Sequence, residues 1–225
     1  MNKMIEQLTR EVPQTDTAVI FVDEQNDFGD ENGKLAVKNG GEVVAPSNRM
    51  HRMAIESGWL RIYGRDWHPK NSVHFIEFGG PWPTHCEQET WGAEFLPGLQ
   101  FKEDELGLII SKGMDPLNPI SYSEFLGFTN DGRKLEQVLR SHGVRRVVVF
   151  GLATDYCVKE TAKDAAGLGF LTYVLTDAVR AVNLNLDKQG NPRLEGPTDE
   201  EIAFSEMYKA GVIRMTTEHI AREWA

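Results

Sequence analysis

The sequence predicts an α/β protein with a mainly parallel sheet that is covered by helices on both faces. Six short apolar runs alternate along the chain with amphipathic stretches, and four of those stretches stop just before a glycine. Alternation of strands and helices favours parallel strands joined by crossover helices. Because 225 residues are enough for one sizeable core, we expect a single domain over residues 1–225.

The strands are predicted from short apolar runs bounded by polar or glycine-containing segments, which are typical of strands in such a sheet. Most of these runs are rich in β-branched residues. The runs are 17–23 (TAVIFVD), 59–66 (WLRIYGRD), 106–112 (LGLIISK), 144–151 (VRRVVVFG), 170–177 (FLTYVLTD) and 212–215 (VIRM).

The helices are predicted from amphipathic stretches between these runs. Glycine just past the last periodic residue is a helix stop signal. The segment Thr198 to Glu201 (TDEE) has the capping-box pattern of a helix start. The predicted helices are 42–57, 132–142, 154–168 and 198–210, which end before Gly58, Gly143, Gly169 and Gly211.

Two segments interrupt the alternation. Residues 67–105 are rich in Pro, Gly, Trp and His and are too long for a plain connection, so we expect them to carry chemistry. Residues 182–197 alternate apolar with polar side chains around a Gly-Asn turn, which predicts a small hairpin.

The composition excludes several classes of partner. A formal charge of -10 without a Lys/Arg block argues against a nucleic acid or an anionic membrane. No apolar run approaches the roughly 18 residues of a membrane span, and residues 1–15 lack the apolar stretch of a signal peptide, so we expect a cytoplasmic protein. Cys86 and Cys157 are expected to be reduced thiols.

Four reactive side chains stand at or shortly after the end of a predicted strand: Asp23, Asp66, Lys112 and Cys157. In open parallel sheets a ligand binds outside the carboxyl ends of the strands, so residues that are distant in sequence can converge there. Taken singly, a strand-end Asp or Lys is more often a turn former or a solvated charge. Their coincidence predicts an active site at this edge.

Cys157 falls in the first turn of the helix predicted over 154–168. A helix N-terminus lowers the pKa of a thiol and offers free N–H groups to an oxyanion. We therefore expect Cys157 to be a nucleophile, with Asp23 taking its proton and Lys112 favouring the anionic states. The alternative is that Cys157 is a small buried hydrophobic residue, the commoner role of a lone cysteine.

A second constellation lies in DWHPKNSVH and PWPTHC and contains Asp66, His68, His74 and His85. Asp and His two residues apart in an extended segment face the same side, so Asp66 and His68 make half of a metal site. His85 would add a ligand, and His74 is a further candidate. Mixed imidazole and carboxylate ligands suit zinc, manganese or iron. The alternative is a polar loop whose histidines bond to the backbone.

The remaining histidines and Cys86 are given structural roles. His51, His142 and His219 lie in helical patterns without partner ligands, so we expect them at the surface. Cys86 adjoins His85 but has no helix start to stabilise a thiolate, and we expect it to pack.

In six ordered blocks the sequence resembles the nicotinamidase/pyrazinamidase branch of the isochorismatase-like (cysteine hydrolase) family. The match runs along most of the chain with similar separations between blocks. The blocks are VDEQNDF (22–28), GRDWHP (64–69), WPTHC (82–86), TWGAEF (90–95), SKGMDP (111–116) and GLATDYCVKETAKDA (151–165).

The resemblance implies a doubly wound three-layer α/β/α sandwich and a set of site residues. It places the catalytic Asp, Lys and Cys on Asp23, Lys112 and Cys157. It implies a cis peptide before Ala153, whose N–H joins that of Cys157 in the oxyanion hole. The metal ligands fall on Asp66, His68 and His85, with His74 added in some members, and the aromatic walls of a pyridine pocket fall on Phe28, Trp82 and Tyr122.

The function implied is hydrolysis of nicotinamide, and also of pyrazinamide, through a Cys157 thioester in NAD salvage, with one divalent metal ion, zinc before iron or manganese. A homo-oligomer is also expected from the resemblance. Three alternatives stay open: another small-amide or carbamoyl amidohydrolase, a hydrolase whose metal-bound water attacks while Cys157 is structural, and a non-catalytic metal-binding module.

Overall fold

A computed structural model of the protein describes residues 16–101, 108–118, 120–187 and 189–224. These residues form a six-stranded sheet in the order β3-β2-β1-β4-β5-β6, and every neighbouring pair is parallel. The predicted fold class and all six strands are confirmed; residues 106 and 107 of the third run lie outside the described residues. The strands are β1 Thr17–Val22, β2 Leu60–Asp66, β3 Leu108–Lys112, β4 Arg146–Leu152, β5 Leu171–Arg180 and β6 Ile213–Met215.

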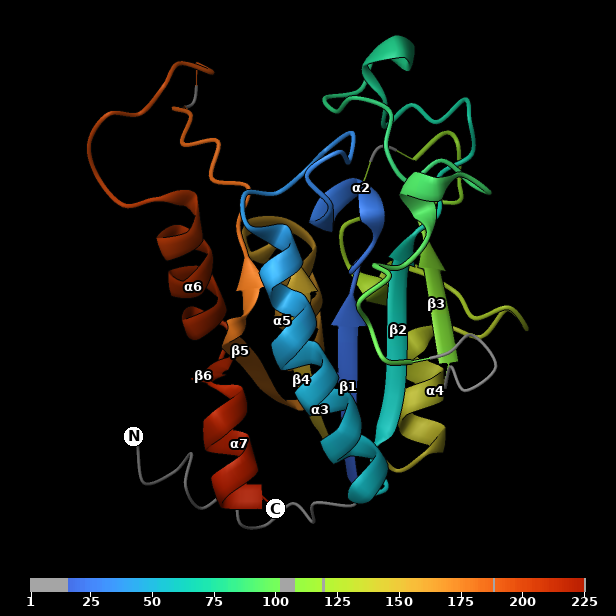
Figure 1. The fold of residues 1–225 in the computed structure, drawn as a ribbon, viewed down its shortest axis with the longest axis vertical. Helices are drawn as coiled ribbons and strands as arrows, with labels where there is room; N and C mark the ends of the chain where they lie inside the picture. The colour runs from blue at the N-terminus through green and yellow to red at the C-terminus, as the bar shows by residue number, and fades with distance from the viewer. Residues whose placement is uncertain (1–15, 102–107, 119, 188, 225) are drawn as a thin grey trace.

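The strand order reverses between β1 and β4. The chain builds the sheet outward through β2 and β3, returns past β1, and builds the other half through β4, β5 and β6. Right-handed crossovers in opposite directions place their helices on opposite faces. Accordingly α3 (Val44–Glu56) lies in front of the sheet with α7 (Thr217–Trp224), while α5 (Lys159–Gly167) lies behind it against α6 (Asp199–Lys209) (Figure 1).

The four predicted helices are present, and their glycine stops are confirmed. The third predicted helix is divided into a π-helical turn, Thr154–Val158, and α5. The capping box of α6 is formed as expected, because Thr198 Oγ1 accepts from Glu201 N–H (3.2 Å) and Thr198 N–H donates to Glu201 Oε2 (2.8 Å). The glycines after α3, α4 (Leu135–Ser141), α5 and α6 all have positive φ, from 68° to 91°.

Two helices were not predicted. The short α2 (Asn26–Gly29) follows β1 directly, and α7 closes the chain after β6. The N-terminus of α7 is fixed by Asp177, whose carboxylate accepts from both the N–H and the hydroxyl of Thr217. Ile220 and Trp224 of α7 are buried against the sheet.

The core lies on both sides of β1 and β4, whose residues are all buried. The expected surface position of His51 is wrong. His51 faces inward from α3, is 3% exposed, and lies 2.8 Å through Nδ1 from the hydroxyl of Tyr63 on β2. A hydroxyl partner of this kind makes a buried imidazole tolerable, because burial of a polar group is costly only when it is unpaired.

The hairpin predicted over 182–197 is reduced to one antiparallel bridge, between Leu186 and Pro192. Around it the segment is irregular and is held by side chains, including the carboxylate of Asp187, which accepts from the amides of Gln189 and Asn191. Among the described helices, no segment combines the length and the apolar character that crossing a membrane requires.

Candidate active site

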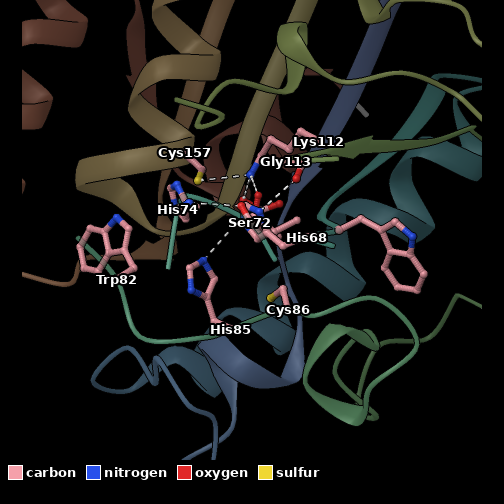
Figure 2. Close-up of polar contacts among 12 residues, drawn as sticks. His68, Ser72, His74, Trp82, His85, Cys86, Lys112, Gly113 and Cys157 are labelled. Carbon is pink, nitrogen blue, oxygen red and sulfur yellow. Dashed lines mark hydrogen bonds and ion pairs between the residues drawn. The ribbon is translucent and has the colours of Figure 1, made fainter. Parts of the chain in front are cut away.

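The side chains predicted at the strand ends meet at the carboxyl edge of the sheet. Lys112, the last residue of β3, lies at the centre of the group: its Nζ is 2.8 Å from Asp23 Oδ2, contacts Asp66 Oδ1, and is 3.5 Å from Cys157 Sγ (Figure 2). Asp66 ends β2 and is the register partner of Lys112. Asp23 follows β1 with φ 48°, a left-handed conformation that is uncommon outside glycine and recurs at functional sites.

Charge is distributed unequally between the two aspartates. Burial would lower the pKa of Lys112, but Asp23 and Asp66 raise it well above its usual value, so the ammonium stays charged. Burial would raise the pKa of Asp66, yet Lys112 and His68 together hold it well below its usual value. For Asp23, burial outweighs Lys112 and the pKa is raised. Asp66 is therefore a fixed anion, and Asp23 is the carboxylate that can accept a proton.

Cys157 lies on the π-helical turn that follows β4. The implied cis peptide is present between Leu152 and Ala153, and Ala153 O accepts from the N–H groups of Tyr156 (3.1 Å) and Val158 (3.2 Å), which fixes the turn. A lowered thiol pKa was expected here, and this is wrong. Burial raises the pKa of Cys157 well above its usual value, against the opposing effect of Lys112. The thiol therefore keeps its proton until a base removes it.

The base is within reach. A carboxylate oxygen from each of Asp23 and Asp66 and the sulfur of Cys157 all lie within 4.8 Å of one another. Since Asp66 is held as an anion by Lys112 and His68, Asp23 is the better acceptor of the thiol proton.

The histidine cluster adjoins this group and shares Asp66 with it. One ring nitrogen from each of His68, His74 and His85 lies within 4.8 Å of the other two. Asp66 Oδ2 is 3.5 Å from His68 Nε2 and 3.7 Å from His85 Nε2. Two ligands of a tetrahedral ion with bonds of about 2.1 Å lie roughly 3.4 Å apart. The three imidazoles, His74 included, lie close enough together to share one metal ion, and Asp66 lies beside two of them, His68 and His85.

Backbone carbonyls orient two of the imidazoles. His68 Nδ1 lies 3.1 Å from Gly113 O and His85 Nδ1 lies 2.7 Å from Pro83 O, which leaves each Nε2 facing Asp66. His68 Nε2 is buried and has no hydrogen-bond partner among the described protein groups. A buried imidazole nitrogen without a donor fits a metal ligand, whose other nitrogen commonly binds a carbonyl or carboxylate.

Residues 102–105 of the segment predicted to carry chemistry lie outside the described residues, and residues 67–101 are held in place by their own backbone and by α2. His68 N–H donates to Cys86 O (3.0 Å), and Asp27 Oδ2 of α2 accepts from Cys86 N–H (2.7 Å). Cys86 itself is fully buried, and burial raises the pKa of its thiol well above the usual value. The cysteine therefore has a packing environment, as expected from the sequence.

A pocket of about 370 Å³, part of it open to solvent, connects the nucleophile with the histidine cluster. Trp82 Nε1 donates to the hydroxyl of Tyr122 (3.0 Å), and the ring of Tyr156 packs against both. The lining residues are Phe28, Leu35, Asp66, His74, Trp82, His85, Tyr122, Leu152, Ala153, Tyr156, Cys157 and Val182.

Two of these pocket residues, Tyr156 and Val182, and the nearby Glu124 were not predicted from the sequence. Tyr156 stands directly before the nucleophile, which was its only signal. Val182 is brought to the pocket by Asp155, whose carboxylate accepts from the N–H groups of Val182 (2.9 Å) and Asn183 (2.8 Å). Glu124 is fully buried and close to Asp23, although its segment gave no periodic signal.

Comparison with known proteins places this geometry in a family context. The model of the isochorismatase domain matches residues 17–219. The nicotinamidase of Escherichia coli is 37% identical over 217 residues, which covers 88% of this chain and 94% of that protein.

Two solved structures share the fold over nearly their whole length. The pyrazinamidase of Pyrococcus horikoshii in complex with zinc has 40% identity and a TM-score of 0.74, covering 89% of this chain and 99% of that one. PnC1 from L. infantum in complex with nicotinate has 32% identity and a TM-score of 0.74, covering 92% and 96% of the two chains.

Proposed function

The chain belongs to the isochorismatase family, and from that premise we propose that it is an amidohydrolase that converts nicotinamide to nicotinate and ammonia and also accepts pyrazinamide. The observation that carries the proposal is one pocket lined both by Cys157 and by His74 and His85 of the histidine cluster, with aromatic walls between. A flat heteroaromatic amide suits such walls. The nicotinamidase relative and the nicotinate-bound neighbour support this substrate.

One divalent metal ion would be held by Asp66, His68, His74 and His85. Imidazole and carboxylate donors suit zinc, iron or manganese, and the zinc complex of the P. horikoshii relative supports zinc. When bound there, the ion would act as a Lewis acid that helps to orient the substrate. The same residues fit the ion because His68 Nε2 is buried and accepts no hydrogen bond from any of the described groups, while the Asp66 carboxylate lies beside it.

The reaction steps belong to Asp23, Lys112 and Cys157. Asp23 takes the thiol proton as Sγ bonds to the amide carbon, and the N–H groups of Ala153 and Cys157 stabilise the oxyanion. The proton then passes from Asp23 to the departing nitrogen, which leaves as ammonia from a Cys157 thioester. Asp23 next deprotonates a water that attacks the thioester, so nicotinate departs and the thiol is restored. Lys112 stabilises the anionic states in both halves.

The role of the nucleophile is tested by Cys157→Ala. We expect ammonia release to fall by at least about 10⁴-fold while bound metal, measured by elemental analysis, stays at the wild-type level. The matched control is Cys86→Ala, which removes the other buried thiol and should keep turnover. A Cys157→Ala enzyme that turns over normally would favour attack by metal-bound water.

The substrate is tested by measuring ammonia from nicotinamide, pyrazinamide and an N-carbamoyl amino acid under the same conditions. We expect the highest kcat/KM with nicotinamide. A preference for the carbamoyl compound would assign the chain to a different branch of the family.

The cellular setting is also part of the proposal. We infer one domain over residues 1–225, a place in NAD salvage in the cytoplasm, and a homo-oligomer. Both cysteines are free, as a reducing compartment requires.

A further inference from the structure

A third carboxyl group, that of Glu124, lies in the catalytic cluster and has no part in the reaction steps above. Glu124 opens a 3-10 helix, Glu124–Leu126, and is completely buried. Its N–H donates to Thr161 Oγ1 on α5 (3.0 Å), which fixes its backbone. It does not line the substrate pocket.

The carboxyl of Glu124 occupies space that strand β2 leaves open at Gly64. A Cβ on Gly64 would lie 2.2 Å from Glu124 Cδ and 2.4 and 2.5 Å from its two oxygens. Gly64 stands two residues before Asp66, on the same face of β2, and its carbonyl accepts from Asp23 N–H (3.2 Å). The fold therefore accommodates this carboxyl beside Asp23, in the space left by the missing side chain of Gly64.

The charges around Glu124 leave it without a cation of its own. The ionisable groups with the largest effects on it are Asp23, which follows β1, Lys112 of β3 and Asp66 of β2. Lys112, the only cation among them, is already paired with both aspartates. No N–H or hydroxyl group among the described residues reaches either Glu124 oxygen. A buried, unpaired carboxylate costs several kcal/mol, so the group is expected to be neutral.

Two neighbouring carboxyl groups avoid the cost of burying two carboxylates by sharing one proton. Burial, and after it the charge of Asp23, raises the pKa of Glu124 well above its usual value. Since Asp23 is held partly as an anion by Lys112, the shared proton belongs on Glu124.

We propose that Glu124 is a positioning residue that, as a neutral carboxylic acid, donates a hydrogen bond to Asp23 and keeps it oriented and ionised to receive the Cys157 proton. The proposal rests on the proposed function only because that function identifies the step as proton transfer from Cys157 to Asp23. Its consequence for Asp23 is physical: a donor to the carboxylate favours the charged form and opposes the effect of burial.

The test compares Glu124→Gln, which keeps a donor but cannot ionise, with Glu124→Leu and Glu124→Ala, which remove it. For nicotinamide hydrolysis by the metal-loaded enzyme, we expect the donor-free variants to lose about 10- to 100-fold in kcat, the range of a hydrogen bond to a charged group. KM should stay within about twofold because Glu124 does not line the pocket. The acid limb of kcat/KM should move to higher pH, and Gln should restore kcat and the wild-type profile.

Alkylation of Cys157 by iodoacetamide against pH supplies a second readout that needs no substrate. The donor-free variants should shift this profile and Gln should not, with Cys157→Ala as the blank for Cys86. If wild-type enzyme releases no ammonia from nicotinamide, the proposed function fails, but the alkylation profiles still decide the role of Glu124.

Three outcomes would overturn the proposal. They are unchanged profiles in the donor-free variants, a loss in Gln as large as in Leu, and an effect confined to KM. Should Glu124→Leu and Glu124→Ala fail to fold by circular dichroism, Glu124→Gln alone decides the proposal. If Glu124 acts as an ionised carboxylate, Glu124→Gln should lose catalysis; if it acts as a neutral donor, the variant should keep it.

Discussion

At the scale of single residues, Lys112 balances the charge of the whole cluster. It is 1% exposed and pairs with both Asp23 and Asp66. Buried ion pairs add little stability compared with apolar replacements of the whole group, but removal of one partner alone leaves an uncompensated charge. The two aspartates are thus compatible with burial only while the ammonium is present.

Replacement of Lys112 by Met should therefore damage stability and catalysis together. We expect the free energy of unfolding to fall by about 3–5 kcal/mol and ammonia release to drop below detection. Urea unfolding followed by tryptophan fluorescence measures the first effect. Lys163→Met is the matched control, because Lys163 forms only partly exposed pairs with Glu160 and Glu206, which are worth less than about 1 kcal/mol. Equal unfolding midpoints for the two variants would contradict this account.

The strand ends could be predicted from sequence because each apolar run stops at a polar residue or a glycine. Asp23, Asp66 and Lys112 follow such runs, and a parallel sheet aligns their ends. Glu124 and Val182 could not be found in this way, because neither lies at the end of a predicted strand. Both reach the site through tertiary contacts, Glu124 through Thr161 and Gly64, and Val182 through Asp155.

At the scale of elements, the amphipathic pattern predicted four helices but did not predict which way every helical side chain faces. His51 is expected at the surface because its helical pattern offers no partner ligands, whereas in the fold Tyr63 of β2 provides it with a buried partner. Helix α7 was missed because only nine residues, TTEHIAREW, separate β6 from the end of the described residues. Its position depends on Asp177, far away in sequence.

The segment that begins at Val182 should control substrate affinity through Asp155. Asp155→Ala removes the acceptor of two backbone N–H groups, so Val182 should lose its fixed place in the pocket wall. We expect KM for nicotinamide to rise about tenfold or more, as befits one or two lost hydrogen bonds, with a smaller change in kcat. Steady-state kinetics separate the two constants.

Asp187→Ala is the matched control, because Asp187 also accepts backbone N–H groups of the segment but lies away from the pocket wall. It should leave KM unchanged. A loss of kcat alone in Asp155→Ala would instead indicate that Asp155 acts on the nucleophile turn.

At the scale of the whole molecule, the site follows from topology. The strand order reverses between β1 and β4, and the residues after these strands, Asp23 and the Cys157 turn, meet at the edge of the sheet where it reverses. Ligand sites in open α/β sheets lie at this switch point. The same arrangement buries several carboxyl groups at one edge, which ties the stability of the fold to pH.

Glu24, which follows Asp23 but takes no part in the reaction steps, allows the dependence of stability on pH to be measured. It is 1% exposed, accepts a hydrogen bond from the Ser47 hydroxyl, and burial raises its pKa to about 8 although Ser47 opposes the shift. The folded state therefore binds more protons than the unfolded state between pH 4.5 and about 8. The stabilising contribution is complete below the ordinary glutamate pKa and is lost as pH rises through the folded value.

Glu24→Gln should remove this dependence, because the amide oxygen still accepts from Ser47 and the side chain cannot ionise. We expect the variant and the wild type to have nearly equal free energies of unfolding at pH 5, and the variant to be more stable by several kcal/mol at pH 9, since each unit of pKa shift is worth about 1.4 kcal/mol. Urea unfolding at a series of pH values measures the difference. Because Asp23 and Glu124 titrate alike in both proteins, the difference isolates Glu24. The exposed Glu218→Gln should show no such trend, and a gap between Glu24→Gln and wild type that stays constant with pH would mean that Glu24 is ionised in the folded protein throughout.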